Sequence, residues 1–321
     1  MSMKPPIVSA ATLVVLSAGL LPAADPGLLN LVMPDAKILA GVNVDQAKAS
    51  PFGVYVLGQI QAQGAPHLQQ VTGLTGFDPT RDLHELLVAS NAVPGQKTGL
   101  ILARGNFDAT HIQAAGLAGG GTTLVYKGVT LLLDPKQVNA VAFLDPTLAV
   151  AGDVASVEAA IDRQTAPAPL PAATVVQVNQ WSGSEDAWVV ANVPFSSLKP
   201  PANASTTANA AVQNAFQNIQ QAAGGVKFGA QVAYTGQALA DTPQDATSVA
   251  SVAQFLASMA QLQAQNKNPQ LAAVLTSLSV TTNGNVVNVS LSVPEAQAEQ
   301  AFKAGPPPAP QSMHRVPRRR Q

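Results

Sequence analysis

Several short stretches in the first half of the chain are rich in aliphatic and β-branched residues, some with alternating polar positions, and such stretches predict β-strands. They are residues 38–44, 86–90, 100–104, 122–126, 129–133, 140–144 and 148–151. The last four form two neighbouring pairs, joined at Lys127-Gly128 and at Asp145-Pro146. Two runs separated by a short turn are typical of a β-hairpin, so the sequence predicts a hairpin at each pair.

Helices are predicted where a capping residue precedes apolar residues at helical spacing. Ser50 followed by Pro51 marks one start, because serine caps free backbone N–H groups and proline is tolerated at the first helical position. Asp108 and Asp153 can cap two further helices in the same way. A long helix is expected to follow Thr242, since apolar residues recur behind it at helical spacing.

The second half of the chain predicts the same kinds of element. The expected elements are strands at residues 188–193 and 226–234, a helix at residues 211–222, and a final helix from residue 294 to residue 304. The second of these strands is expected to continue past a turn formed by Thr235-Gly236. Asn283-Gly284 lies between two β-rich runs, which is the strongest short signal for a hairpin.

Each half therefore closes with a hairpin that leads directly into a helix, at residues 140–162 and 279–303. This order predicts an α+β protein with antiparallel or mixed sheets and helices packed on one face, and it allows two similar halves. The expected organisation is a signal peptide (1–24), a first α+β unit (25–164), a proline-rich linker and loop (165–185), a second α+β unit (186–304) and a disordered, basic, proline-rich tail (305–321).

The N-terminal segment has the pattern of a secretory signal peptide. Lys4 precedes an apolar run from residue 7 to residue 21, and Pro22-Ala23-Ala24 supplies the small residues of a cleavage site. We expect cleavage after Ala23 or Ala24. The run is shorter than the ~20 residues that span a bilayer, and no second long apolar run follows. The mature chain is therefore expected to have no transmembrane segment and to be periplasmic or secreted.

Composition narrows the possible chemistry. The chain has no cysteine, which excludes disulfides, thiolate catalysis and cysteine-based metal sites and is compatible with an oxidising compartment. Only 11% of residues are charged, against an average of about 25%. Setting aside Lys4 and the four arginines of the tail leaves 12 basic residues against 18 acidic ones. A negative body argues against binding to nucleic acid, which needs clustered positive charge.

One charged segment contains the only acid–base candidates that we single out. His84-Glu85 begins like the metal-binding H-E-x-x-H motif, but Val88 stands where the second histidine is needed, so no metal site is expected. Asp82, His84 and Glu85 are weak candidates for catalytic acid–base groups. The alternative is a solvated turn, in which Asp78 caps a first helical turn and the acidic groups lie near a helix N-terminus.

Trp181 and Trp188, the two tryptophans of the chain, are the candidate binding residues. Exposed tryptophans stack on sugar rings or anchor protein partners. The alternative is that both indoles fill a sheet face in the core, which is the commoner place for such residues.

Two segments of the chain resemble exported bacterial proteins of unknown function. One runs from Leu148-Ala-Val-Ala-Gly152-Asp153 into the predicted helix that follows, and the other is Met33-Pro-Asp35-Ala-Lys-Ile. In such proteins a short last strand turns at Gly-Asp into an amphipathic helix. The resemblance implies an α+β fold and an envelope or secreted location, and it assigns no catalytic residue.

These observations favour a non-catalytic periplasmic or secreted protein that binds a macromolecular partner, such as an envelope protein or polymer. The reasons are a mostly neutral body and the lack of a coherent acid–base or metal set. Two alternatives stay open: an envelope hydrolase that uses carboxylate and histidine chemistry, and an inhibitor of an envelope enzyme. No cofactor is expected, and the sequence leaves the oligomeric state open.

Overall fold

The computed structural model describes residues 24–92, 99–194, 216–267 and 269–304. The strands of the first half are β1 (Ile38–Asn43), β2 (Leu83–Ser90), β3 (Gly99–Gly105), β4 (Thr122–Tyr126), β5 (Val129–Leu133), β6 (Asn139–Asp145) and β7 (Leu148–Asp153). The helices of this half are α1 (Pro26–Leu29), α2 (Val44–Ala49), α3 (Pro51–Thr75), α4 (Pro79–Asp82), α5 (Ala109–Ala118) and α6 (Val154–Thr165). The expected signal peptide, except Ala24, and the expected tail lie outside the described residues.

The second half has a similar succession of strands and helices. Its strands are β8 (Ala187–Ala191), β9 (Ile219–Lys227), β10 (Gln231–Ala240), β11 (Ser279–Asn283) and β12 (Val286–Pro294). Its helices are α7 (Ala172–Ser184), α9 (Pro243–Lys267), α10 (Pro269–Leu275) and α11 (Glu295–Ala304). Within the described ranges, no helix combines the length and the hydropathy that crossing a membrane requires.

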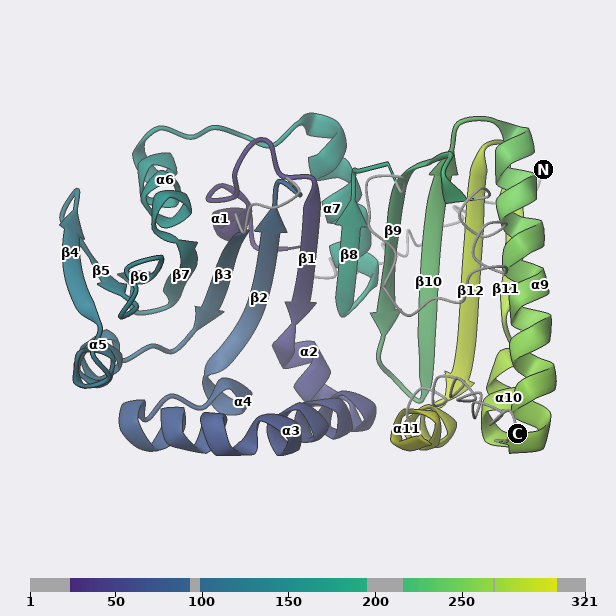
Figure 1. Ribbon diagram of the computed structural model, residues 1–321, viewed down its shortest axis with the longest axis horizontal. Helices are drawn as coiled ribbons and strands as arrows, with labels where there is room; N and C mark the ends of the chain where they lie inside the picture. The colour runs from purple at the N-terminus through teal and green to yellow at the C-terminus, as the bar shows by residue number, and fades with distance from the viewer. Residues whose placement is uncertain (1–23, 93–98, 195–215, 268, 305–321) are drawn as a thin grey trace, which may run out of the picture.

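All twelve strands form one antiparallel sheet in the order β11-β12-β10-β9-β8-β1-β2-β3-β7-β6-β5-β4 (Figure 1). Both halves use the same order outward from the centre, β1-β2-β3-β7-β6 in the first and β8-β9-β10-β12-β11 in the second. They meet where β1 pairs antiparallel with β8. Each half ends with a hairpin that leads into a helix, α6 or α11. The expected α+β class and two similar halves are confirmed.

The predicted helix starts are confirmed by capping hydrogen bonds. Ser50 Oγ accepts from the Gly53 N–H at 2.9 Å, where α3 begins. Asp108 Oδ1 accepts from the N–H of His111 at 3.0 Å at the start of α5, and Asp153 caps α6 in the same way. These contacts are local in sequence, which is why the pattern of capping residues identifies them without knowledge of the fold.

Three local predictions differ from the structure. Residues 219–222, predicted as helix, belong to β9, where Gly224 lies so close to β10 that a Cβ would meet Thr235 O at 2.9 Å. Sheet pairing on both sides of β9 overrides the helical preference of its alanines. The expected turn at Thr235-Gly236 lies within β10, which begins after a turn at residues 228–230. Much of the expected linker is α7, which packs on β8 and β9.

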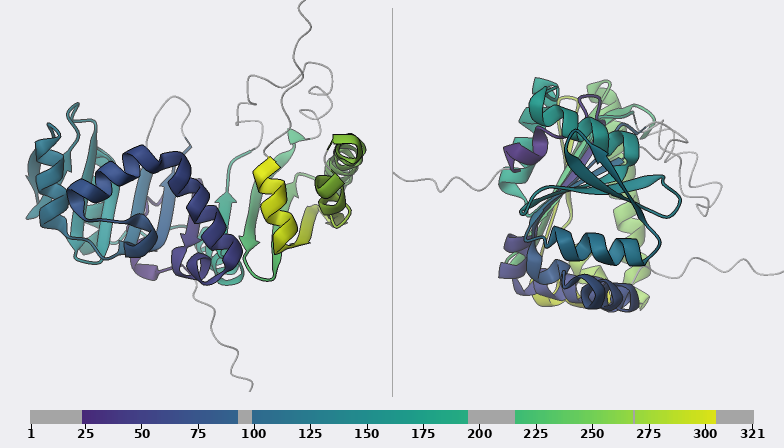
Figure 2. Two further views of the ribbon diagram at one scale, coloured as in Figure 1. Left: turned by 90° about the horizontal axis from the view of Figure 1, so that it is seen from below. Right: turned by 90° about the vertical axis from the view of Figure 1, so that its left-hand side faces the viewer.

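Helices lie on both faces of the sheet rather than on one (Figure 2). Leu131 and Leu132 are neighbours on β5 and therefore point to opposite faces. Leu131 lies in the main core with Val157 of α6, whereas Leu132 packs against Gly116 of α5. β5 carries aliphatic residues at successive positions, and that pattern fits a strand covered from both sides.

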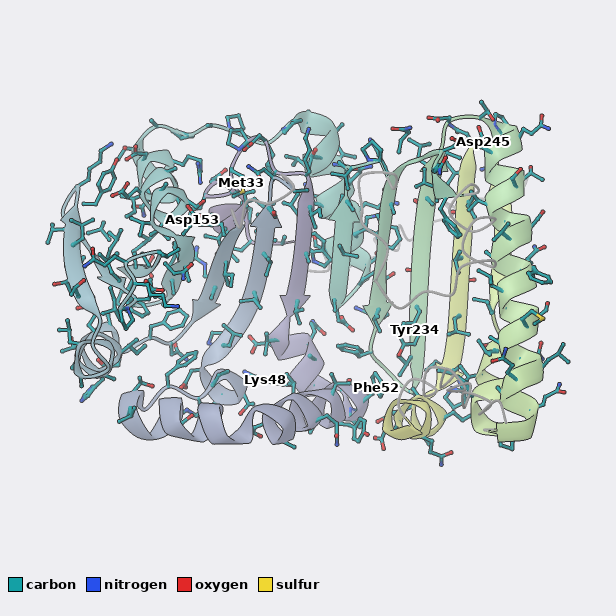
Figure 3. All side chains as sticks on the ribbon, in the orientation of Figure 1. Met33, Lys48, Phe52, Asp153, Tyr234 and Asp245 are labelled. Atoms are coloured by element: carbon teal, nitrogen blue, oxygen red, sulfur yellow. The ribbon has the colours of Figure 1, made fainter. Side chains whose placement is uncertain are left out.

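Among the described residues, the core has one large cluster, which extends from the first half into α7 and β8, and two smaller ones. The large cluster lies between one face of the sheet and the helices α1, α6 and α7. One smaller cluster joins Val249 of α9 to the sheet, and the other joins Phe52 of α3 to β10 and β12. Phe52 and Tyr234 come from these two distant parts of the sequence and lie near one another at the lower part of the sheet (Figure 3).

Candidate functional site

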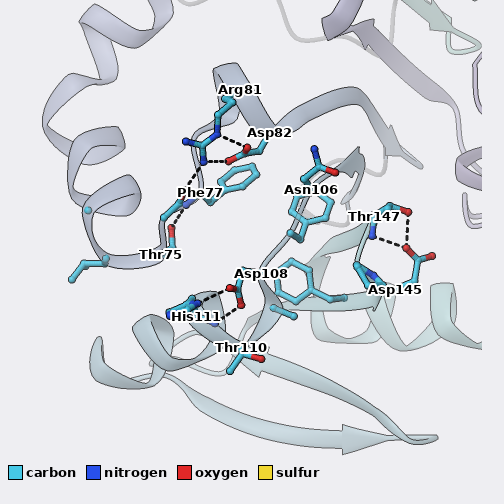
Figure 4. A pocket seen from close by; sticks show the side chains of 17 residues that line it. Thr75, Phe77, Arg81, Asp82, Asn106, Asp108, Thr110, His111, Asp145 and Thr147 are labelled. Carbon is cyan, nitrogen blue, oxygen red and sulfur yellow. Dashed lines mark hydrogen bonds and ion pairs between the residues drawn. The ribbon is translucent and has the colours of Figure 1, made fainter.

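A cleft of about 1000 Å³ opens where the end of α3, the end of α4, the loop between β3 and α5, and the turn between β6 and β7 meet (Figure 4). Its lining comes from four separate stretches of sequence, all in the first half of the chain. The lining side chains form an aromatic floor and a charged or polar rim.

The floor of the cleft is a row of three half-buried phenylalanines. The rings of Phe77 and Phe107 have centroids 5.5 Å apart, and those of Phe107 and Phe143 are 5.6 Å apart. These separations lie in the range of favourable aromatic pairs. The chain has nine phenylalanines in all, so a third of them are gathered at this cleft. We call this row the phenylalanine floor.

Two glycines allow the segments around the floor to approach one another. Gly76 ends α3 in the left-handed conformation, with φ 70°, and the chain then turns to bring Phe77 into the cleft. Gly105 lies against α4, where a Cβ would clash with the Asp82 carbonyl oxygen. The next residue, Asn106, donates its N–H to the same Asp82 carbonyl at 2.8 Å. Glycine at 105 therefore lets the end of β3 carry Phe107 to the floor.

The rim carries three carboxylates that are already engaged by neighbours. Asp82 accepts two hydrogen bonds from the Arg81 guanidinium, both 2.7 Å, and one from the Asp78 N–H at 2.8 Å. The Arg81 bonds are the largest cause of a lowered pKa for the Asp82 carboxyl. This carboxylate is therefore ionised at neutral pH and held in one orientation.

The other two rim carboxylates are ionised for similar reasons. The N–H of His111 is the largest cause of a lowered pKa for Asp108, and the imidazole Nδ1 lies 2.6 Å from the same carboxyl. At Asp145, burial is the largest effect and raises the pKa, but bonds from the Thr147 hydroxyl and N–H, together with Arg104, outweigh it. The net pKa of Asp145 is lowered. None of the three is suited to act as a general acid near neutral pH.

The structure does not bring the three predicted acid–base residues together. Asp82 lines the cleft, but neither His84 nor Glu85 does. The His84 ring lies between Asp45, 2.9 Å from Nδ1, and Asn106, 3.2 Å from Nε2. Glu85 instead accepts from the Asp25 N–H at 3.1 Å, and burial raises its pKa. Asp78 caps α4, so the alternative interpretation of a capped first turn describes this segment.

The predicted binding residues are core residues. Trp181 and Trp188 are each 6% exposed and lie in the large hydrophobic cluster. Trp188 stacks over Gly41 of β1, where a Cβ would lie 2.6 Å from the indole ring. Neither ring offers an exposed face for a sugar or a protein partner, so the structure supports the alternative interpretation, a role in packing.

The sequence does contain a signal for two of the floor residues. The pattern Phe-Asp-x-Thr occurs at residues 77–80 and again at residues 107–110. In both, the aspartate is the N-cap of the next helix, and the phenylalanine before it points into the cleft. A hydrophobic residue before an N-cap often fixes the entry of the chain into a helix. Here the same arrangement builds the phenylalanine floor.

Comparison with known proteins adds information on the fold. No family model and no curated protein matches this sequence. Among solved structures, crystal form III of TP0453 has a TM-score of 0.51 at 7% identity, covering 86% of this chain and 97% of that chain. The fold is similar to that of TP0453. Crystal form I gives a TM-score of 0.48 at 9% identity, covering 86% and 96%. Identities this low concern the fold alone.

The described residues also limit metal chemistry. Among them, no group of three or more His, Asp or Glu side chains is arranged to hold a metal ion. The carboxylates at the cleft are engaged one by one with Arg81, His111 and Thr147. What the cleft offers is an aromatic surface bordered by oriented polar groups, an arrangement suited to binding.

Proposed function

We propose that this chain is a non-catalytic exported protein, and that the phenylalanine floor is the surface on which it binds a macromolecular partner. The observation that carries the proposal is the row of three half-buried rings lining one open cleft. Large aromatic side chains supply most of the binding energy at many interfaces, because they bury much area at little cost in conformational entropy.

The polar rim supports binding rather than turnover. A hydrolase of the carboxylate type needs one protonated acid and one ionised base facing the same bond. At this cleft Asp82, Asp108 and Asp145 all have lowered pKa values, and His84 does not line it. The rim can still accept hydrogen bonds from a partner. An exposed segment of an envelope protein or polymer, with an apolar face and hydrogen-bond donors beside it, fits this surface.

Export is the second part of the proposal, and the start of the fold supports it. Ala24 is 4% exposed, and its N–H donates to Ser182 Oγ at 2.9 Å. Cleavage after Ala23 would retain this buried contact, whereas cleavage after Ala24 would remove it. N-terminal sequencing of the chain isolated from its native source should therefore begin at Ala24. A sequence that begins at Met1 would contradict export by a cleaved signal.

The binding claim is tested by replacing the central ring of the floor. Phe107→Leu keeps an apolar side chain but removes the aromatic face that contacts both Phe77 and Phe143. The matched control is Phe255→Leu on α9, where the ring is 63% exposed and far from the cleft in the sequence and the sheet. Tagged full-length wild type and both variants would be used to capture partners from an envelope extract, with quantitative mass spectrometry as the readout.

The expected result is one reproducible partner retained by wild type and Phe255→Leu, with about tenfold weaker affinity for Phe107→Leu, as the loss of one aromatic contact implies. Circular dichroism would establish that each variant is folded. Equal affinity of a folded Phe107→Leu variant for the partner would contradict the assignment of the site. Turnover of a substrate without a lasting complex would contradict the non-catalytic claim.

A further inference from the structure

The twelve-stranded sheet has two outer edges, at β4 and at β11. β4 has the sequence Thr-Thr-Leu-Val-Tyr, which contains no charge and no proline and consists of residues that favour strands. Leu124 is 39% exposed and Val125 is 67% exposed. Figure 1 shows β4 as the outermost strand at its end of the sheet. An uncharged edge strand with exposed aliphatic side chains is a template for pairing with another strand.

The register of the β4–β5 hairpin determines which backbone groups of β4 face outward. Tyr126 pairs with Val129, and the two residues between them have φ values of 48° and 84°. That is a two-residue turn of type I′, in which the flanking pair exchanges two hydrogen bonds. Hydrogen-bonded pairs alternate along an antiparallel ladder. The N–H and C=O groups of Thr123 and Val125 therefore point away from β5.

At the opposite edge of the sheet, α9 packs along β11 and one of its side chains engages an outward backbone group. The same counting from the β11–β12 hairpin places the backbone groups of Val280 on the outer side of β11. There the Val280 carbonyl accepts a hydrogen bond from Gln254 Nε2 of α9 at 3.1 Å. No described residue makes a comparable bond to the outward groups of Thr123 or Val125. A side chain of α9 therefore engages the outer side of β11, whereas no described side chain engages the outward backbone groups of Thr123 and Val125 on β4.

We infer that β4 pairs antiparallel with β4 of a second copy of this chain, about a two-fold axis through Leu124. In this register Thr123 of each copy lies opposite Val125 of the other, and their outward N–H and C=O groups form four hydrogen bonds. Leu124 lies opposite its own counterpart, and Thr122 lies opposite Tyr126. The inference goes beyond the proposed function and does not depend on the cleft.

Self-complementarity is the reason to choose a second copy as the partner. The strand carries no charge, so the two-fold pairing places no like charges opposite one another. Lys127, just beyond the strand, falls opposite Gly121 rather than opposite a second lysine. The molecule already contains antiparallel pairing between two similar units, because its two halves meet where β1 pairs with β8. Pairing at β4 would extend the sheet across both copies.

A register-specific cross-link tests the geometry in a chain that has no cysteine of its own. Leu124→Cys places two thiols opposite each other in a non-hydrogen-bonded pair, where Cα atoms are about 4.5 Å apart, within the range of a disulfide. The matched control is Thr123→Cys, whose counterpart is two positions out of register at about 8 Å, beyond that range. A covalent dimer is expected for Leu124→Cys and none for Thr123→Cys. A monomer in both, or equal cross-linking of both, would overturn the inference.

A charge exchange tests the same pairing in solution without covalent chemistry. The wild-type mass measured by light scattering should double as the protein concentration rises. Leu124→Lys and Leu124→Glu should each stay monomeric, because like charges then face each other on the axis, and an equimolar mixture should form the dimer again. A wild type that stays monomeric at every concentration would overturn the inference, and so would a Leu124→Lys variant that still dimerises. In either case, a peptide strand from another protein would be the next occupant to test.

Discussion

At the scale of single residues, glycines determine how closely the strands and helices approach. Gly41 on β1 is buried beneath the Trp188 indole, and Gly105 is held against the Asp82 carbonyl. Both positions exclude a side chain because of a neighbour that is remote in sequence. The glycine that makes room for the Trp188 ring is almost 150 residues away and carries no local signal. The sequence alone therefore left Trp188 open as a candidate binding residue.

The packing of Trp188 can be measured by adding one carbon atom beneath it. Gly41→Ala places a Cβ 2.6 Å from the indole, and such overpacking of a core costs about 1–3 kcal/mol of unfolding free energy. Gly58→Ala is the control, because that position lies in α3 and the added carbon would meet nothing within 4 Å beyond its neighbours and the backbone of its own helix. There alanine should stabilise by about 0.5–1 kcal/mol. Urea denaturation measures both, and an unchanged Gly41→Ala variant would mean that Trp188 is loosely packed.

At the scale of elements, the sequence predicts the helices and hairpins whose deciding contacts are local. Capping at Ser50, Asp108 and Asp153, and the hairpins at Lys127-Gly128 and Asn283-Gly284, were all predictable because the deciding residues are adjacent in sequence. β9 and α7 were not predictable in the same way. β9 is a strand because it pairs with β8 and β10. The prolines before α7 predicted a linker, but the helix forms and packs on the sheet.

The contribution of capping can be measured at α3, which forms one wall of the cleft. Ser50→Ala removes the hydroxyl that accepts from the Gly53 N–H and should cost about 1 kcal/mol of unfolding free energy. Ser248→Ala is the control, since that hydroxyl bonds back to the Gln244 carbonyl in the exposed interior of α9. Its removal should leave stability unchanged or slightly raised. Thermal unfolding of the two variants gives the comparison, and equal melting temperatures would contradict the capping role.

At the scale of the whole molecule, two similar halves share one sheet and differ in what they add to it. The first half carries an additional hairpin, β4–β5, which forms the open edge of the sheet, and it also contains the cleft. In the second half, α9 packs along the edge strand β11 and bonds to one of its carbonyls. The candidate binding surface and the candidate pairing edge therefore both belong to the first half. The similarity of fold to TP0453 assigns neither surface.

The cleft could not be predicted from the sequence. Its floor joins Phe77, Phe107 and Phe143, which come from three segments that only the folded sheet brings together. The two Phe-Asp-x-Thr patterns predict where helices begin, but the sequence does not place them beside the β6–β7 turn. Asp82 is the one predicted site residue at this cleft, because it lies beside the first of these patterns.

The central claim is that the phenylalanine floor is the contact surface, and hydrogen–deuterium exchange tests it most directly. The full-length chain would be compared alone and with the captured partner, and peptides would be resolved by mass spectrometry. Slower exchange is expected at the segments that line the cleft, residues 73–77, 81–82, 106–111 and 143–147, with no change in α9. Slower exchange confined to α9 or to the second half, with the cleft segments unchanged, would contradict the claim.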